Sequence, residues 1–168
     1  MISDSPSSTR FTMAAGPFGE LLVATEDGEA LSRVWLPPAH PEPGWIRDDE
    51  LPVLAFARRQ LAEYFSGERT DFDLPLAARG TPFQHKVWDA LRRIDYGTTR
   101  SYGQIADEIG APGAARAVGA ANHDNPLAIV VPCHRVVGVN GSLVGYAGGL
   151  DQKRTLLELE TTGARLPL

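Results

Sequence analysis

Residues 101–122, SYGQIADEIGAPGAARAVGAAN, decide the fold that this sequence predicts. Ser101 and Gln104 make the capping-box pair typical of a helix start, and a glycine six residues further on suits the helix end. Residues 111–122 predict a second helix, made almost wholly of small residues around Arg116. Two short helices joined by a turn form the core of a helix-turn-helix unit.

The flanking segments extend this unit into a small domain. Before it, Thr81 and Pro82 suit the start of a helix that runs to Ile94. After it, the sequence predicts a short buried strand at residues 126–131, then a strand, a turn and a glycine-rich loop at residues 136–149. A final helix is expected to turn three leucines inward: Leu150, Leu156 and Leu157.

The order of these elements indicates a fold class for the second part of the chain. Three helices followed by a strand-turn-strand element are typical of a winged helix-turn-helix fold. In such folds the second helix of the turn pair enters a groove of DNA. We therefore expect residues 80–168 to form a winged helix-turn-helix-like domain.

The first part of the chain has a different pattern. Residues 11–36 predict short strands, separated by glycine turns at GPFG and EDGE. Residues 37–49 hold four prolines and predict a loop. Residues 50–68 carry apolar side chains at helical spacing, and residues 68–80 predict an extended connector. The sequence thus predicts a small α/β domain over residues 1–79, and an α+β fold for the whole chain.

Composition limits the classes of protein to which the chain can belong. With 168 residues, 43% of them hydrophobic and 22% charged, it has the make-up of a globular protein. No apolar run approaches the roughly 18 residues that span a bilayer, and residues 1–10 lack the apolar core of a secretory signal, so we expect no membrane association. A single cysteine excludes an internal disulfide and fits the reducing cytoplasm. One cysteine and four scattered histidines also predict no metal site.

The charge of the chain is unevenly distributed. The net charge of −5 does not by itself suggest a partner such as nucleic acid. However, residues 1–79 hold seven basic and thirteen acidic residues, whereas residues 80–168 hold nine and eight. The second part can therefore carry a locally positive face.

The only cysteine, Cys133, lies in the segment IVVPCHRVVG at residues 129–138. A lone cysteine after an apolar run is usually a small buried hydrophobic residue. Its neighbours favour a reactive thiol instead, because Pro132 interrupts the strand and His134 and Arg135 follow directly. A histidine can take the thiol proton and leave a thiolate. A bridging water is the favoured route, since adjacent side chains of an extended segment point apart.

A histidine that acts as a base needs a third group to orient it. Sequence spacing leaves four carboxylates open as candidates, and each of them can equally be a solvated side chain on a helix: Asp124, Asp151, Glu158 and Glu160. Nothing in the spacing of the residues selects one of the four.

The alanine-rich helix has two interpretations. Its small side chains either allow tight packing against a neighbouring helix, or they let it lie in a DNA groove with Arg116 inserted into the base stack. Tyr102 and Tyr146 can likewise be core residues or ligand-binding residues. Most tyrosines are core residues whose hydroxyl contacts water. Tyr146, however, lies in GYAGG, whose glycines leave backbone N–H groups open to a ligand.

Four motifs follow one another along the second part of the chain. They are SYGQIA from Ser101, GAARAVGAAN from Gly113, NP at Asn125 with PCHRV from Pro132, and GYAGG from Gly145. In order and spacing they resemble the O6-alkylguanine-DNA alkyltransferase family. The resemblance covers about residues 80–160. The first part is similar, more loosely, to that family's RNase-H-like N-terminal domain, which implies a structural role.

The resemblance implies a role for each matching residue at the thiol. Cys133 would accept the alkyl group, His134 would be its water-mediated base, and Glu160 would orient that histidine. Asn125 would hold the turn that presents the thiol. Arg116 would fill the gap that a flipped nucleotide leaves in the duplex.

The other implied contacts are with DNA and with the damaged base. Tyr102 would rotate the nucleotide and then meet the guanine ring nitrogen, Tyr146 would stack on the base, and Lys153 would place a charge near the active-site loop. Further DNA contacts are expected at Ala114, Ala115, Ala117, Gly119 and Arg135. Further base contacts are expected at Val136 and at the backbone N–H of Ala147, where some relatives carry a serine.

The implied activity is DNA repair by irreversible transfer of an alkyl group from O6-alkylguanine in duplex DNA to Cys133, with O4-alkylthymine left open as a second substrate. The protein would act once, without metal or other cofactor, as a cytoplasmic monomer, with clustering along DNA left open. An acid at Asp124, close to the expected DNA, departs from this pattern.

Two other classes of protein remain as alternatives. A Cys–His hydrolase would share the thiol and the base, but it would turn over repeatedly. A non-enzymatic winged-helix DNA-binding protein would need base contacts for specificity, and the alanine-rich helix offers few of them.

Overall fold

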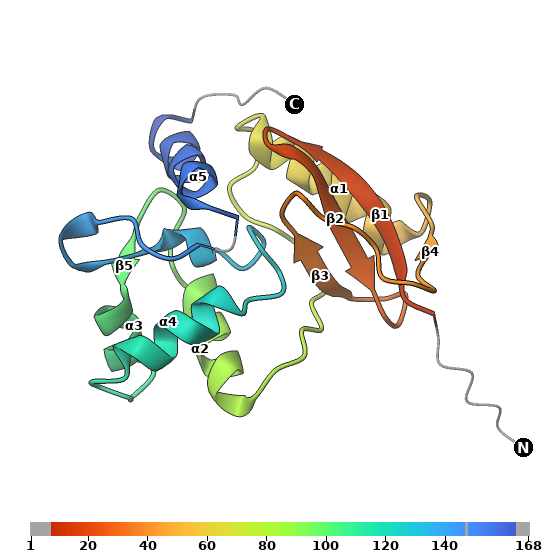
Figure 1. Cartoon of the computed structure of the whole chain (residues 1–168). Coiled ribbons are helices and arrows are strands. Elements are labelled where there is room, and N and C mark those ends of the chain that lie inside the picture. The colour runs from red at the N-terminus through yellow and green to blue at the C-terminus, as the bar shows by residue number, and fades with distance from the viewer. Residues whose placement is uncertain (1–7, 147, 164–168) are drawn as a thin grey trace, which may run out of the picture.

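The computed structural model describes residues 8–146 and 148–163. Figure 1 shows two packed halves, with a sheet and helix α1 on one side of the molecule and a group of short helices on the other. The described residues therefore have the expected α+β architecture, with the four-stranded sheet in the first half and four of their five α-helices in the second.

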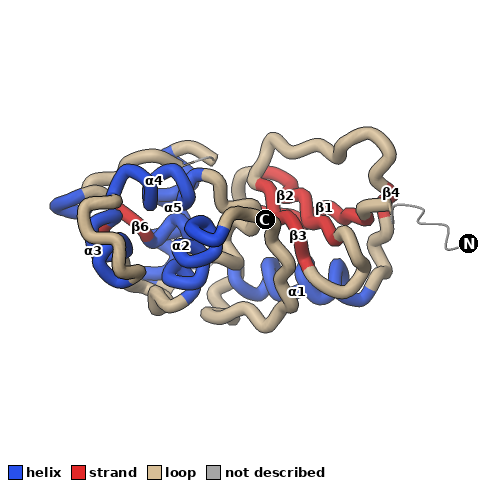
Figure 2. The backbone as a smooth tube through the Cα atoms, turned by 90° about the horizontal axis from the view of Figure 1, so that it is seen from below, coloured by secondary structure: helices blue, strands red, loops and turns tan. Residues whose placement is uncertain are grey.

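The first half is built around an antiparallel sheet with one parallel edge strand. Its strands are β1 (Arg10–Gly16), β2 (Gly19–Thr25), β3 (Leu31–Trp35) and β4 (Ile46–Arg47), in the order β3-β2-β1-β4. The GPFG and EDGE segments form the predicted turns, whereas β4 is a short strand within the proline-rich segment that predicted a loop. Helix α1 (Pro52–Phe65) covers one face of the sheet, as Figure 2 shows from below, and buries the apolar side chains that predicted it.

The second half is a group of short helices. They are α2 (Pro82–Arg92), α3 (Tyr102–Glu108), α4 (Ala115–His123) and α5 (Leu150–Thr162), with 3-10 turns at Cys133–Arg135 and Val139–Gly141. The starts of α2 and α3 follow their local signals, because the side chains of Thr81 and Ser101 each accept a hydrogen bond from the backbone N–H three residues on. Helix α4 packs against both α2 and α3.

The strand expected at residues 126–131 does not form. This segment makes isolated bridges to Val34 and within itself, and it turns at Ile129, whose φ is +69°. Such a conformation is a genuine outlier for a β-branched residue. The Asn125 side chain explains the turn, because it bonds to backbone groups at both ends of the segment and so replaces the partners that a strand would supply.

The strand-turn-strand element expected at residues 136–149 is also different. Strand β6 (Val136–Val137) pairs in parallel with β5 (Arg100–Ser101), and the segment after the 3-10 turn is not a strand. The Lys153 ammonium donates to the backbone oxygen of Val136 at 2.6 Å and to that of Val144 at 3.0 Å. A side chain from α5 therefore satisfies carbonyl groups on both arms, where a hairpin ladder was expected.

Helix α5 forms as predicted, but its inward face is different. Leu156 and Leu159 are buried and Leu157 is half-buried. Leu150 was expected to face inward, and it is 42% exposed at the first position of the helix. The buried face of α5 is completed by two charged residues, Lys153 and Glu160.

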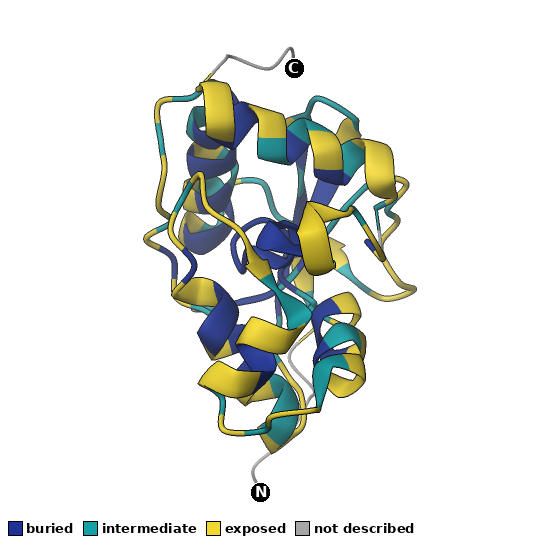
Figure 3. Cartoon of the chain, turned by 90° about the vertical axis from the view of Figure 1, so that its left-hand side faces the viewer, coloured by how far each residue is buried: buried dark blue, intermediate teal, exposed yellow. Residues whose placement is uncertain are grey.

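One hydrophobic core runs through both halves. It includes Val34 of the sheet, Leu61 of α1, Leu91 of α2, Val118 of α4 and Leu156 of α5. Figure 3 shows this buried interior in dark blue and the outward sides of the helices in yellow. Side chains of α1 can therefore reach groups near Cys133. None of the described helices is long and apolar enough to cross a membrane.

Candidate active site

Cys133 is the first residue of a buried 3-10 turn and is 5% exposed. The preceding loop is folded around Asn125. Its amide nitrogen donates to the backbone oxygen of Val131 at 2.9 Å, and its amide oxygen accepts from the backbone N–H of Leu127 at 3.0 Å. Two residues beyond Val131, the thiol is thus presented by a turn that one asparagine side chain holds together, which is the geometry expected for Asn125.

A second asparagine bonds to the 3-10 turn that contains the thiol, and sequence reasoning missed it. Asn122 belongs to α4, is 2% exposed, and its amide nitrogen donates to the backbone oxygen of Cys133 at 3.3 Å. Its position within a run of small residues concealed it, because the whole run was interpreted as a packing surface or a DNA-facing surface. A buried amide side chain needs polar partners, and that requirement was the available signal.

His134 is held by Glu160. The Nε2 atom of His134 lies 3.0 and 3.1 Å from the two carboxylate oxygens of Glu160, and both side chains are buried. Asp124, Asp151 and Glu158, the other three candidates, are exposed. Burial acts to raise the pKa of Glu160, but hydrogen bonds from His134 and Arg135 outweigh it and lower this pKa from 4.5 to about 2. Glu160 is therefore ionised in the folded protein.

An ionised carboxylate fixes the tautomer of His134. Because Glu160 can only accept hydrogen bonds, the proton of the neutral imidazole lies on Nε2, and Nδ1 is left as a proton acceptor. Nδ1 is buried without a hydrogen-bond partner among the described residues. Burial lowers the pKa of His134 below 6.5, against the opposite effect of Glu160. The imidazole is therefore neutral near pH 7 and able to take a proton.

The thiol itself is protonated at rest. Burial raises the pKa of Cys133 above 9.0, while a hydrogen bond from Asn125 and the positive charge of Lys153 act in the opposite direction. The resting protein therefore holds a thiol and not the thiolate that the neighbouring histidine suggested, and the proton has to leave during the reaction.

Val136, one of the residues expected to contact the base, is buried, and its backbone oxygen accepts a hydrogen bond from Lys153.

The expectation that Arg135 contacts DNA is wrong. Its side chain is 7% exposed, and its guanidinium bonds to the Glu160 carboxylate and, at 2.7 Å, to the backbone oxygen of Ile94. The guanidinium also lies 5.6 Å from the ring centre of Tyr96. Arg135 instead supplies the positive charge that permits a carboxylate to be buried beside His134.

Tyr64 is another residue of this cluster that sequence reasoning missed. It lies on α1, in the other half of the chain, and its hydroxyl oxygen is 3.3 Å from Oε1 of Glu160. The signal was present, because Tyr64 lies three residues after Leu61 on the buried face of α1. A buried phenol hydroxyl usually finds a polar partner.

Two further tyrosines are electrostatic neighbours of the thiol. Tyr146 is buried, and its pKa is raised well above 10 by burial and by the neighbouring Cys133. Its hydroxyl has no hydrogen-bond partner within residues 8–146 and 148–163. Tyr102 is half-buried at the start of α3 and donates to the backbone oxygen of Val144 at 3.1 Å. The expected contact at Ala147 lies outside the described residues.

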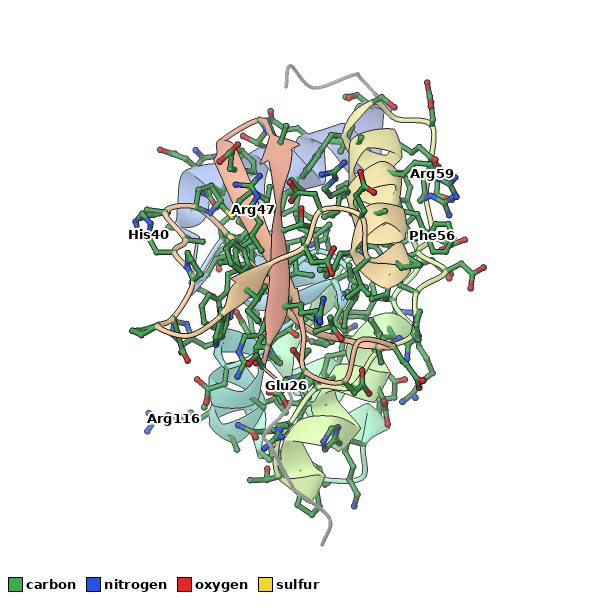
Figure 4. All side chains as sticks on the ribbon, turned by 90° about the vertical axis from the view of Figure 1, so that its right-hand side faces the viewer. Glu26, His40, Arg47, Phe56, Arg59 and Arg116 are labelled. Carbon is green, nitrogen blue, oxygen red and sulfur yellow. The ribbon has the colours of Figure 1, made fainter. Side chains whose placement is uncertain are left out.

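Helix α4 has one face that packs inward and one that is exposed. Val118, Ala121 and Asn122 face inward, where the helix packs on α2 and α3. Arg116 and Ala117 are exposed, and Arg116 projects from the molecule in Figure 4. The other small residues expected to meet DNA are half-buried: Ala114, Ala115 and Gly119. Asp124 is exposed at the end of the helix.

The cluster around Cys133 is a set of proton-transfer groups. No group of three or more His, Cys, Asp or Glu side chains is placed to hold a metal ion within the part of the chain that the structure describes. The site therefore consists of a thiol, an imidazole and a carboxylate, with Arg135, Tyr64, Asn122 and Asn125 around them. This arrangement can pass a proton from sulfur to nitrogen and hold the resulting charge.

Family models match both halves of the chain. Residues 9–78 match the ribonuclease-like domain, and residues 82–162 the DNA-binding domain, of 6-O-methylguanine DNA methyltransferase. The match to residues 9–78 confirms the expected RNase-like first domain.

Curated relatives and solved structures agree with this match. The methylated-DNA–protein-cysteine methyltransferase of Mycobacterium leprae is 52% identical over 86% of this chain and 87% of the relative. The constitutive enzyme of that name from Bacillus subtilis is 48% identical over 89% and 94%. The crystal structure of Mycobacterium tuberculosis OGT in complex with DNA has a TM-score of 0.84 and 50% identity, and covers 94% of each chain.

Proposed function

Because this chain belongs to the 6-O-methylguanine DNA methyltransferase family, we infer that it repairs DNA by moving an alkyl group from guanine O6 to its own cysteine, Cys133. One observation carries the assignment of the residues. The thiol of the only cysteine, the His134 imidazole and the Glu160 carboxylate are buried together. A DNA-bound relative of the same fold supports duplex DNA as the partner.

The geometry supports a proton transfer that is coupled to alkyl transfer. The thiol proton passes to Nδ1 of His134 through a bridging water, and the imidazolium that forms is stabilised by Glu160. The sulfur then bonds to the alkyl carbon as the bond between that carbon and guanine O6 breaks. The electron pair goes to the guanine ring, where Tyr102 is the expected proton donor to the ring nitrogen.

The product is a thioether on the protein. A thioether is stable, because a thiolate is a poor leaving group for displacement from an alkyl carbon. Each molecule therefore acts once, which distinguishes it from a Cys–His hydrolase. Cys133 is only 5% exposed, and Tyr146, a buried neighbour of the thiol, is the residue expected to stack on the base.

The exposed face of α4 supports sequence-independent contact with DNA. Alanine side chains leave room for the duplex backbone, and Arg116 is the side chain long enough to enter the base stack. Phosphate contacts then supply the affinity, with Asp124 opposing them. Three properties stay predictions: an alkylated base as the substrate, a monomeric state and a cytoplasmic location. Clustering along DNA and O4-alkylthymine as a second substrate stay open.

The first prediction tests the inferred reaction directly. When the protein is incubated with a duplex that contains O6-methylguanine, we expect one methyl group on Cys133 and loss of the lesion in equal amount. Peptide mass spectrometry locates the methyl group, and nucleoside analysis measures the lesion. An unmodified Cys133 with the lesion intact would contradict the function. Removal of many lesions per molecule would favour the hydrolase alternative.

The second prediction concerns Arg116. In Arg116→Ala, alkyl transfer from duplex DNA should slow by about tenfold or more. Unstacking the flipped nucleotide costs a few kcal/mol, and without Arg116 no side chain fills the gap to offset that cost. Transfer from a free alkylated base should keep its rate. Arg59→Ala removes one exposed charge from α1, distant from Arg116 in Figure 4, and serves as the control. Equal slowing of the duplex and free-base reactions would show that Arg116 does not act in nucleotide flipping.

A further inference from the structure

Tyr64 is a buried tyrosine of the first half of the chain, and its hydroxyl lies in the candidate active site. It is fully buried on α1, and its ring packs against three aromatic neighbours. Their ring centres lie 5.5 Å away for Phe65, 5.4 Å for Phe72 and 6.3 Å for Tyr96. Packing on this scale fixes the ring, and with it the direction of the hydroxyl group.

The Tyr64 hydroxyl points at the pair formed by His134 and Glu160. It lies 3.3 Å from Oε1 of Glu160 and 3.5 Å from Nε2 of His134. Burial, and then the Glu160 charge, raise the pKa of Tyr64 well above 10, so the phenol keeps its proton. Since the carboxylate can only accept, the Tyr64 O–H donates to Glu160.

We propose that Tyr64 is a positioning residue for the His134–Glu160 pair and sets the basicity of the imidazole. This role rests on the proposed function, in which His134 takes the thiol proton. It also assigns the first half of the chain a part in the reaction, beyond covering the second half.

Sharing of one carboxylate among three donors is the physical basis of the proposal. His134 Nε2, the Arg135 guanidinium and the Tyr64 hydroxyl all donate to Glu160. Each donor draws on the negative charge that would otherwise stabilise an imidazolium. The Tyr64 hydrogen bond therefore makes Glu160 a weaker partner for protonated His134, and helps to keep His134 neutral and ready to accept a proton.

Other titratable and charged groups also face this pair, and they remain in place when Tyr64 changes. They are Tyr96 from the loop after α2, Cys133 and Arg135 from the 3-10 turn, Tyr146 from the loop before α5, and Lys153 from α5. A substitution that removes only the Tyr64 hydroxyl thus isolates its effect on His134.

The test is Tyr64→Phe, which keeps the aromatic ring and removes the hydroxyl. We expect the titration midpoint of His134, followed by NMR in the protein without DNA, to rise by about half to one pH unit, as the loss of one hydrogen bond to a charged group implies. The acid limb of the rate–pH profile for single-turnover methyl transfer should move to higher pH by the same amount. Methylation of Cys133 should still go to completion.

Phe72→Leu is the matched control, because it removes ring packing on Tyr64 and leaves the hydroxyl in place. It should lower thermal stability and leave both midpoints unchanged, because Phe65 and Tyr96 still hold the ring of Tyr64 and the direction of its hydroxyl. An unchanged His134 midpoint in Tyr64→Phe, or an equal shift in Phe72→Leu, would overturn the proposal. Because the NMR titration needs no reaction, it decides the role of Tyr64 even if the wild-type protein were to leave O6-methylguanine intact, a result that would overturn the proposed function instead.

Discussion

Replacement of Cys133 by serine is expected to abolish alkyl transfer and to leave binding of alkylated duplex measurable. Serine matches cysteine in shape, so the bond from Asn122 to the 3-10 turn and the bond from Asn125 to Val131 just before it should persist. A hydroxyl is a far weaker nucleophile than a thiol at neutral pH, and a neutral His134 cannot make up that difference. The measurement is the fraction of O6-methylguanine left after incubation with excess protein.

Binding controls for misfolding in this experiment. Cys133→Ser should shift alkylated duplex in a gel or by anisotropy at protein concentrations close to those for wild type, because Cys133 is buried and α4 is unchanged. Equal repair by the variant and the wild type would remove Cys133 from the mechanism. Loss of both repair and binding would point to misfolding, and Cys133→Ala would then take its place.

Local signals predicted most of the fold. Thr81 and Ser101 begin helices because each cap bonds within three residues, so the sequence window contains the whole interaction. The turn at Ile129 and the missing hairpin before α5 could not be predicted in this way. They depend on side chains outside the expected strands, Asn125 just before the turn and Lys153 in α5.

The residues of the site fall into the same two groups, those that local sequence predicts and those that depend on distant segments. Cys133 and His134 are adjacent in sequence, so their chemistry can be read from the motif. Glu160 was selected only through the family resemblance, since four carboxylates fitted the spacing equally well. Arg135 was misplaced because its guanidinium is buried by packing against segments that lie far away in the sequence, and Tyr64 was missed for the same reason.

Glu160→Gln is expected to destabilise the protein by about 3–5 kcal/mol near pH 7. The change leaves the buried Arg135 guanidinium without its counter-charge, and removal of one partner from a buried ion pair carries a cost of this size. That is a large part of the roughly 5–15 kcal/mol that stabilises a typical domain. Denaturant unfolding of the two proteins measures the difference, with Glu158→Gln, an exposed site on the same helix, as the control.

The stability lost in Glu160→Gln should depend on pH, and the lowered pKa of Glu160 sets the direction of that dependence. In the folded protein this pKa is about 2, compared with 4.5 for an ordinary glutamate, so the carboxylate stabilises the fold fully above about pH 4.5. Wild type loses this contribution, about 3 kcal/mol, as the pH falls from about 4.5 to 2. Glutamine has no proton to gain, so the gap between the two proteins should narrow over that range. A gap that stays constant down to pH 2 would mean that folding does not lower the pKa of Glu160.

The same substitution should slow alkyl transfer even where the variant is fully folded. Glutamine can still accept the N–H of His134, but it carries no charge to stabilise the imidazolium that forms when Cys133 loses its proton. General-base catalysis contributes about 10²–10⁴-fold, and we expect a loss of at least about a hundredfold in the single-turnover rate. The measurement is made at a temperature well below the unfolding midpoint of Glu160→Gln, with Glu158→Gln again as the control. A folded variant that transfers the alkyl group at the wild-type rate would show that the buried carboxylate serves stability alone, and that the thiol proton leaves by another route.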